Sequence, residues 1–242
     1  MVYVMSDIHG QYSLFLKMLK IIKFSENDIL YVLGDVIDRG PDGIACLQEI
    51  MKRKNIKMLL GNHEHMMLTV FDENYRIRNS EGFDSHDVYL LWYKNGCQPT
   101  VSSFNKLPEE EQKELLKFIK NIPVNIEVTV NNKDFLLTHA APLPKYFDRD
   151  LSEHYRYSND TEFAVWCRRF HHSDIGKTVI YGHTPTSYFQ NYKPLRIYKE
   201  KGSNYIDIDC GCAYITNKNH KGGRLGCIRL DDMKNFYSEY RI

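Results

Sequence analysis

Short apolar runs that each end in aspartate, histidine or asparagine constrain the fold of this chain most strongly. Three of them occupy the first seventy residues, as VYVMSD (2–7), DILYVLGD (28–35) and IKMLLGNHE (56–64). Residues at helical spacing separate them, first Leu14, Phe15, Met18, Leu19 and Ile22, then Ile44, Leu47, Ile50 and Met51. This strand–helix–strand order predicts an α/β fold with parallel strands joined by right-handed crossovers. HEHMMLTVF (63–71) predicts a third helix.

The remainder of the chain contains fewer helical signals and more neighbouring strands. Residues 72–98 mix polar and aromatic side chains without a clear period, and we interpret 72–120 as an insertion or cap on a single domain spanning 1–242. LPEEEQKELLKFIKNIP (107–123) predicts a helix, with Pro108 and acids at its start and Lys120 near its end. TEFAVWCRRF (161–170) predicts a short helix.

Several later segments are predicted to be strands. Residues 124–130 and 135–140 predict a β-hairpin over the four-residue turn NNKD. KTVIYGH (177–183), NYIDIDCGCAY (204–214) and RLGCIRL (224–230) supply further strands, so we expect a mixed or doubled sheet. Cys210 and Cys212 fall at strand period two and are expected in the core.

Charge and cysteine usage exclude several classes of protein. The formal net charge is +1, which argues against a strongly basic nucleic-acid surface. MVYVMSDIHG lacks a basic signal-peptide region, and no run approaches the roughly 20 apolar residues of a membrane span. The six cysteines include no C-x-x-C pair, so we expect reduced thiols in a cytoplasmic protein.

Side chains suited to metal binding follow five of the predicted strands. They are Asp7 and His9, Asp35 and Asp38, Asn62 and His63, His139, and His183. Each alone is an ordinary turn residue, but the joint pattern is hard to obtain from turns. Because ligands bind outside the carboxyl ends of strands in an open α/β sheet, we expect these side chains at one rim.

The residue types indicate the class of metal. Carboxylate, amide oxygen and imidazole suit Mn²⁺, Fe²⁺ or Zn²⁺, and the lack of thiolate disfavours a closed structural zinc site. Six ligands are too many for one open catalytic ion and suit two ions that share a bridging carboxylate. Asp35 is expected on the central strand, which makes it the natural bridge.

The motifs SDIHG, GDVIDRG, GNHEHM, THAA and GHTP occur in this order, and together they resemble those of the calcineurin-like metallophosphoesterases. The resemblance runs from Val2 to about Leu230. The second and third motifs are similar to the serine/threonine phosphoprotein phosphatase branch, especially its small bacterial and phage members. Symmetrical diadenosine tetraphosphatases share them. The resemblance implies a four-layer α-β-β-α sandwich with mixed sheets and a small helical insertion.

The resemblance also implies ligand sets for two metals and a mechanism. One metal would be held by Asp7, His9 and Asp35, and the second by Asp35, Asn62, His139 and His183. We expect Mn²⁺, with Fe²⁺ or Zn²⁺ as alternatives. A hydroxide bridging the two ions would attack phosphorus in line.

Further residues match the family's catalytic groups. His63 is similar to the proton donor to the leaving oxygen, Asp38 would orient it, and Arg39 would grip the phosphate oxygens. VWCRRF resembles the segment that carries a second phosphate-binding arginine. It points to Arg168, with Arg169 as the alternative. An arginine at this position could instead be an ordinary surface residue on a short helix.

The remaining polar and aromatic residues have less specific interpretations. Glu64 and His65 are expected to support the site or cap the third helix rather than to bind metal, and Asp42 to be a helix-cap or turn residue. The aromatic side chains Tyr89, Trp92 and Tyr93 could pack internally or stack on a base.

The residues leave several functions open. The leading hypothesis is a serine/threonine protein phosphatase that hydrolyses phosphomonoesters in a phosphorylated protein or a small phosphorylated substrate. The alternative is a symmetrical dinucleoside tetraphosphate hydrolase, which would need a base-binding surface. An inactive phosphate-binding module would lack a ligand or the proton donor, and every matched position is filled. The near-neutral charge disfavours a nucleic-acid phosphodiesterase, so we expect neither nucleic-acid nor membrane partners.

Overall fold

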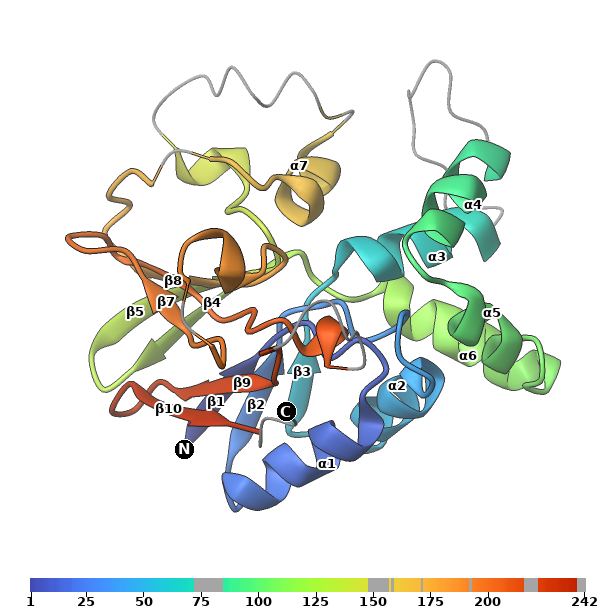
Figure 1. The fold of residues 1–242 in the computed structure, drawn as a ribbon, viewed down its shortest axis with the longest axis horizontal. Helices are drawn as coiled ribbons and strands as arrows, with labels where there is room; N and C mark the ends of the chain where they lie inside the picture. The colour runs from blue at the N-terminus through green and yellow to red at the C-terminus, as the bar shows by residue number, and fades with distance from the viewer. Residues whose placement is uncertain are drawn as a thin grey trace.

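The computed structural model describes residues 1–71, 85–147, 157, 159–170, 172–191, 193–215 and 222–238. In these residues two five-stranded sheets lie face to face, and helices flank them (Figure 1). The predicted α/β sandwich with four layers and mixed sheets is confirmed.

The first sheet contains the three strands predicted near the N-terminus. β1 (Val2–Met5), β2 (Ile29–Val32) and β3 (Ile56–Met58) are parallel, with α1 (Tyr12–Ile21) and α2 (Gly43–Lys52) between them in sequence. β9 (Gly226–Arg229) and β10 (Lys234–Tyr237) add antiparallel partners beyond β1.

This addition changes which strand is central. The order β10-β9-β1-β2-β3 places β1 in the middle of the sheet. The expectation that Asp35 sits on the central strand is therefore wrong, because β2 is central only among the three parallel strands and Asp35 follows its end.

The second sheet has the order β4-β5-β6-β8-β7. Its strands are β4 (Asn125–Val130), β5 (Lys133–Thr138), β6 (Thr178–Tyr181), β7 (Tyr198–Lys199) and β8 (Tyr205–Asp207). The predicted hairpin is confirmed, but its turn has two residues rather than four. Asn131 and Asn132 have φ values of 51° and 61°, as a tight hairpin turn requires, so Lys133 already pairs with Val130.

The strand predicted over 204–214 is shorter than expected. β8 ends at Asp207, and the backbone then turns through Gly211, whose φ is 72°. Cys210 therefore follows the strand, and Cys212 begins the short helix η4 (Cys212–Tyr214). Both cysteines are buried, so their core position is confirmed although their strand position is not.

The helices beyond the first sheet contain two departures from the sequence predictions. The bounds are α3 (Asn62–Phe71), α4 (Ser85–Lys94), α5 (Gln98–Phe104), α6 (Glu109–Lys120) and α7 (Asp160–Trp166), with single turns η1 (Pro144–Tyr146) and η3 (Thr186–Tyr188). α4 lies in a segment for which we predicted no clear period. α7 ends at Trp166, so Arg168 lies just after this helix rather than on it.

Apolar clusters separate the layers. One cluster joins the facing sides of the sheets, with Val4 and Tyr31 from the first sheet and Leu137 and Ile180 from the second. Another packs α1 and α2 on the outer side of the first sheet. Tyr146 and Phe170 pack on the outer side of the second sheet, where Figure 1 shows α7 nearby. The two sheets thus bring the ends of β1, β2, β3, β5 and β6 together.

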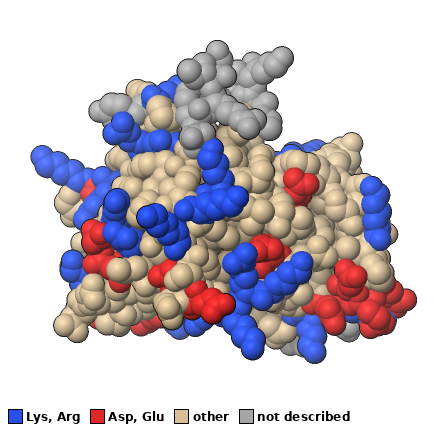
Figure 2. Space-filling view, turned by 90° about the horizontal axis from the view of Figure 1, so that it is seen from below, with Lys and Arg blue, Asp and Glu red and all other residues tan. Residues whose placement is uncertain are grey.

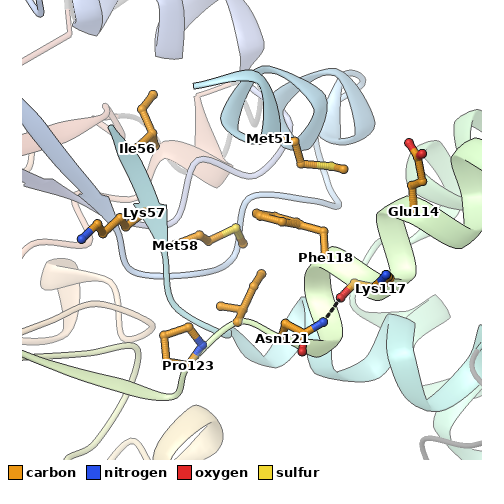
Figure 3. Close-up of a pocket in the computed structure, with 10 residues that line it drawn as sticks. Met51, Ile56, Lys57, Met58, Glu114, Lys117, Phe118, Asn121 and Pro123 are labelled. Atoms are coloured by element: carbon orange, nitrogen blue, oxygen red, sulfur yellow. Dashed lines mark hydrogen bonds between the residues drawn. The ribbon is translucent and has the colours of Figure 1, made fainter. Parts of the chain in front are cut away.

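A cavity of about 610 Å³ lies at the β3 edge of the first sheet, between α2 and α6. In Figure 3 the ring of Phe118 points toward the side chain of Met58, whereas Lys57 points away. None of its lining residues is a predicted metal ligand or phosphate-binding residue.

The surface and the helices agree with the composition. Acidic and basic side chains are interspersed on the face shown in Figure 2, and the formal net charge is +1. Among the described residues, helices that combine the length and the hydropathy needed to cross a membrane are absent.

Candidate metal centre

The loops after the strands have unusual backbone conformations. Of the non-glycine residues with φ between 45° and 70°, a region that costs energy for side chains with a Cβ, six follow β1, β2 and β6: Asp7, His9, Asp35, Asp38, Arg39 and His183. Such backbone strain is concentrated at functional sites in proteins. Here it turns side chains from three separate loops toward the rim between the two sheets.

The first group of metal-binding side chains comes from the ends of β1 and β2. His9 Nε2 lies 3.6 Å from Asp35 Oδ2 and 3.9 Å from Asp7 Oδ1. All three side chains are buried. The structure therefore brings together the ligands expected for the first metal.

The second group lies on the other side of Asp35. His139 Nε2 is 3.4 Å from Asp35 Oδ1. One terminal atom of the Asn62 amide lies 3.1 Å from His139 Nε2 and 2.9 Å from His183 Nδ1. Asp35 thus lies between the two groups, where its carboxylate could be shared by both.

In His9 and His139, one ring nitrogen bonds to a backbone carbonyl oxygen, and the other nitrogen is left available to bind a metal. His9 Nδ1 lies 3.0 Å from the Ile37 carbonyl oxygen, and His139 Nδ1 lies 2.6 Å from that of Leu33. Because a carbonyl oxygen only accepts, each of these nitrogens must carry the proton, and Nε2 keeps its lone pair. Metal-binding histidines typically have such a partner for the second ring nitrogen.

His183 and Asp7 are held in the same manner. His183 Nε2 lies 3.2 Å from the Trp166 carbonyl oxygen, which leaves Nδ1 facing Asn62. Asp7 Oδ2 accepts hydrogen bonds from the Ser6 hydroxyl and from the backbone N–H of His183, the latter at 3.0 Å. Asp7 Oδ1 remains directed toward His9.

The electrostatics of the donor set fit divalent cations. Burial lowers the pKa of His9, His139 and His183, so these imidazoles are neutral and able to bind metal. Burial and the charge of Asp7 raise the pKa of Asp35. Electron-pair donors packed this closely repel one another, and cations between them would remove that repulsion.

Distances alone permit one other ligand set. The ligand atoms of His9, Asp35 and His63 all lie within 4.8 Å of one another, as do those of Asp35, His139 and His183. His63 Nε2 is 3.8 Å from Asp35 Oδ2, so His63 competes with Asp7 for the first metal. Its contact with Asp38 supports a role in proton transfer instead.

His63 forms a buried pair with Asp38. His63 Nδ1 lies 2.5 Å from Asp38 Oδ2, and Asp38 N–H donates to the Thr100 hydroxyl at 2.9 Å. Burial raises the pKa of Asp38 to about 7, and it lowers the pKa of His63. An imidazole oriented by a carboxylate in this way is typical of a proton-transfer residue.

Trp92 of α4 also contacts this pair. Trp92 Nε1 donates to Asp38 Oδ2 at 2.5 Å, and the Trp92 side chain is 0% exposed. The interpretation of Trp92 as a base-stacking surface is therefore wrong. Tyr93 is 51% exposed and Tyr89 is partly buried, so for these two residues stacking stays untested.

Two arginines lie near the histidines. The Nη1 and Nη2 atoms of Arg39 are 3.1 Å from His9 Nε2 and 3.2 Å from His63 Nε2. Arg168 is an exposed residue, and its Nη1 donates to the His183 carbonyl oxygen at 2.9 Å. The charge of Arg168 adds to burial in lowering the pKa of His63 and His183, which places Arg168 at the rim.

Glu64 supports the loop that carries Asp35. Glu64 Oε2 accepts from the backbone N–H of Asp35 at 2.9 Å and of Gly61 at 3.2 Å. Its Oε1 accepts from Val36 at 2.8 Å and Ile37 at 3.2 Å. The interpretation of Glu64 as a supporting residue is confirmed, and burial with the charge of Asp35 raises its pKa to about 8.

Two buried carboxyl groups near the site were not singled out from the sequence. Asp209 Oδ1 accepts from Gly211 N–H at 2.8 Å, and Asp207 Oδ1 accepts from Asp209 N–H at 2.9 Å. Burial raises the pKa of both, with further contributions from Asp209 for Asp207 and from Asp7 for Asp209. The sequence signal for them was the alternation IDID within an apolar run, because aspartates in a predicted buried strand indicate buried carboxyl groups.

The paired sheets and this donor set define a metallophosphoesterase. Consistent with that class, the sequence profile described as calcineurin-like phosphoesterase matches residues 1–202. The chain belongs to this family.

Relatives within the family include two kinds of named protein. The chain is 33% identical over 155 residues to a symmetrical bis(5'-nucleosyl)-tetraphosphatase of Wigglesworthia glossinidia brevipalpis, covering 62% of this chain and 47% of that one. It is 29% identical over 212 residues to serine/threonine-protein phosphatase 2 of Salmonella typhimurium, covering 84% and 87%. The chain thus spans about half the length of that tetraphosphatase and most of that phosphatase.

The fold is also similar to that of a solved structure. The cold-active protein-tyrosine phosphatase of a psychrophilic Shewanella species superimposes with a TM-score of 0.53 and 17% identity, covering 98% of this chain and 80% of that one. This likeness concerns the fold alone.

Proposed function

We propose that the protein is a metal-dependent phosphoric ester hydrolase with two divalent cations at the rim between its sheets. The observation that carries the proposal is the position of Asp35, with Oδ2 3.6 Å from His9 Nε2 and Oδ1 3.4 Å from His139 Nε2. Asp7 and His9 complete the first site with Asp35, and Asn62, His139 and His183 complete the second. Mn²⁺ is the expected ion, with Fe²⁺ and Zn²⁺ as alternatives for this donor set.

The bound cations would lower the pKa of a water and withdraw charge from the phosphate. The residues of the chain perform the other tasks. The guanidinium groups of Arg39 and Arg168 bind phosphate oxygens, for which the planar donor fork of arginine is suited. Because Arg39 lies 3.2 Å from His63 Nε2, a phosphate held by Arg39 lies next to that nitrogen.

His63 transfers the proton to the leaving group. The bound phosphate anion favours the protonated imidazole, opposing the effect of burial. As the bond between phosphorus and the ester oxygen breaks, His63 Nε2 donates its proton to that oxygen. Asp38, 2.5 Å from His63 Nδ1, stabilises the protonated ring and fixes its orientation. Water supplies the new oxygen on phosphorus and the proton that restores His63.

For the substrate, we infer phosphoserine or phosphothreonine in a protein. The similarity to the Salmonella serine/threonine phosphatase supports this choice, because it extends over 84% of this chain and 87% of that protein. A symmetrical dinucleoside tetraphosphate is the second candidate. It is favoured by the 33% identity to the Wigglesworthia tetraphosphatase and by the exposed aromatic ring of Tyr93, which could contact a base.

A substrate panel tests both candidates. The Mn²⁺-loaded protein is assayed with a phosphoserine peptide, diadenosine tetraphosphate, p-nitrophenyl phosphate and bis(p-nitrophenyl) phosphate. We expect the highest kcat/KM for the peptide. A higher value for the tetraphosphate would favour the second candidate, and inactivity toward all four with metal bound would contradict a hydrolase.

Two arginine variants provide a matched pair for the phosphate-binding step. Arg168→Ala is expected to raise KM for the phosphopeptide, whereas Arg169→Ala, one residue further along the same exposed loop, should leave it unchanged. The reverse result would assign the second phosphate arginine to Arg169.

A further inference from the structure

Trp92 reaches the Asp38–His63 pair from a part of the chain remote in sequence from both residues. It lies in α4, and its indole Nε1 donates to Asp38 Oδ2 at 2.5 Å. The side chains of Trp92, Asp38 and His63 are all 0% exposed. Trp92 is thus shielded from solvent and can influence a reaction only through the residues that it contacts.

A single oxygen of Asp38 receives both neighbours. His63 Nδ1 also lies 2.5 Å from Asp38 Oδ2, whereas Asp38 Oδ1 has no hydrogen-bond partner among the described residues. A carboxylate bonded through one oxygen to one partner can rotate and offer its other oxygen. The second donor on Oδ2 opposes that rotation, because turning the carboxylate would leave a buried indole N–H without an acceptor.

The helices around Trp92 hold the same loop at other points. Asp38 N–H donates to Thr100 Oγ1 at 2.9 Å, and Arg39 N–H donates to the Gly96 carbonyl oxygen at 2.9 Å. The Trp92 ring packs edge-on against Phe71 of α3, with ring centroids 5.8 Å apart. The indole therefore packs against α3 through its ring and bonds to Asp38 through its N–H.

We propose that Trp92 is a positioning residue for proton transfer by His63, acting through the shared oxygen of Asp38. This inference rests on the proposed function of His63. In it, α4 completes the catalytic apparatus, although no atom of Trp92 touches the substrate. Burial raises the pKa of Asp38, and hydrogen bonds with Thr100 and with the Trp92 indole lower it, in keeping with stabilisation of the carboxylate by both residues.

The role predicts a dependence on the leaving group. Trp92→Phe keeps an aromatic ring and removes the N–H. The alkoxide leaving from a phosphoserine peptide needs a proton, whereas p-nitrophenolate leaves without one. We expect kcat for the peptide to fall about tenfold, which is less than the loss expected when a general acid is removed altogether. We expect kcat for p-nitrophenyl phosphate to change by less than about threefold.

Three further variants separate positioning from packing. Val88→Ala removes buried volume from the same helix one turn earlier and should affect both substrates equally if it affects either. His63→Asn should show a larger loss of the same leaving-group-dependent kind. The double variant with Trp92→Phe and His63→Asn should be no slower toward the peptide than His63→Asn alone, because the indole acts through His63.

A spectroscopic readout does not depend on turnover. The chain has two tryptophans, so a ¹⁵N–¹H spectrum shows two indole N–H signals, and Trp166→Phe assigns them. We expect the Trp92 signal far downfield, and we expect Asp38→Asn to move it upfield in a protein that stays folded. An unchanged signal would overturn the inference.

The kinetic outcomes distinguish failure of the inference from failure of the proposed function. If His63→Asn shows the leaving-group-dependent loss and Trp92→Phe slows both substrates equally, as Val88→Ala does, the inference is overturned and the function of His63 stands. If His63→Asn itself shows no such dependence, the proposed function of His63 fails and the inference fails with it.

Discussion

His63 and Asp38 lie 25 positions apart in sequence, yet His63 Nδ1 is 2.5 Å from Asp38 Oδ2 and both side chains are fully buried. Neighbouring strand ends create this contact, since Asp38 follows β2 and His63 follows β3. The pairing supports the proposed role of His63 in proton transfer, whereas distances alone would also admit it as a metal ligand.

His63→Asn separates these two roles. We expect kcat toward the phosphopeptide to fall by roughly 10²–10⁴, with two Mn²⁺ still bound, because the change removes a proton donor and no ligand. His172→Asn is the control, since His172 pairs with Glu200 and stacks on Tyr205, outside the site. Loss of one metal from His63→Asn would place His63 in the first metal site.

Glu64→Gln tests how the loop carrying Asp35 is held. The four backbone N–H groups bonded to Glu64 need two acceptor oxygens, and glutamine offers one. In the variant, two buried N–H donors would face the amide NH₂ group, which cannot accept from them. We therefore expect the free energy of unfolding, measured in urea, to fall by about 2–4 kcal/mol. Glu26→Gln, at an exposed position, should change stability by less than about 0.5 kcal/mol. An equal effect of both variants would contradict this role.

Acidification should destabilise the metal-free protein through His65. Burial lowers the pKa of His65 to about 4 in the folded state, while the unfolded chain retains a value near 6.5. Between these values the unfolded state binds the extra proton, so the contribution of His65 to stability falls as pH decreases, by about 2 kcal/mol from pH 7 to pH 5.

Urea unfolding of wild type and His65→Gln at pH 7 and pH 5 measures this contribution. Buried carboxyl groups with raised pKa, such as Glu64, change stability in the opposite sense, so the informative quantity is the difference between the two proteins. On acidification from pH 7 to pH 5, the free energy of unfolding of His65→Gln should fall by about 2 kcal/mol less than that of wild type. Equal losses would show that His65 does not titrate in this way.

The strand-end pattern predicted much of the candidate site, because the ligands follow strands whose carboxyl ends meet. Asp7, His9 and Asp35 needed only local motifs and the rule that parallel strands end at one edge. Trp92 could not be placed, because its hydrogen bond to Asp38 spans 54 positions and depends on how α4 packs. Its aromatic ring suggested stacking, and only tertiary structure shows that the N–H is used.

Two features of the strands could not be predicted from the pattern of apolar residues: the length of the hairpin turn and the position of β1 within its sheet. Asn131 and Asn132 close the hairpin in two residues because asparagine tolerates positive φ, which the sequence NNKD did not distinguish from a longer turn. The central position of β1 depends on β9 and β10, more than 200 residues later in the chain.

The metal content of Asp35→Asn tests the central claim most directly. After equilibrium dialysis against Mn²⁺ and elemental analysis, we expect two ions per wild-type chain and well under one in Asp35→Asn, because both sites share this carboxylate. Asp42→Asn is the matched control at an exposed acid beside the same loop and should retain two. Two ions per chain in Asp35→Asn would contradict the bridging role and the metal centre built on it.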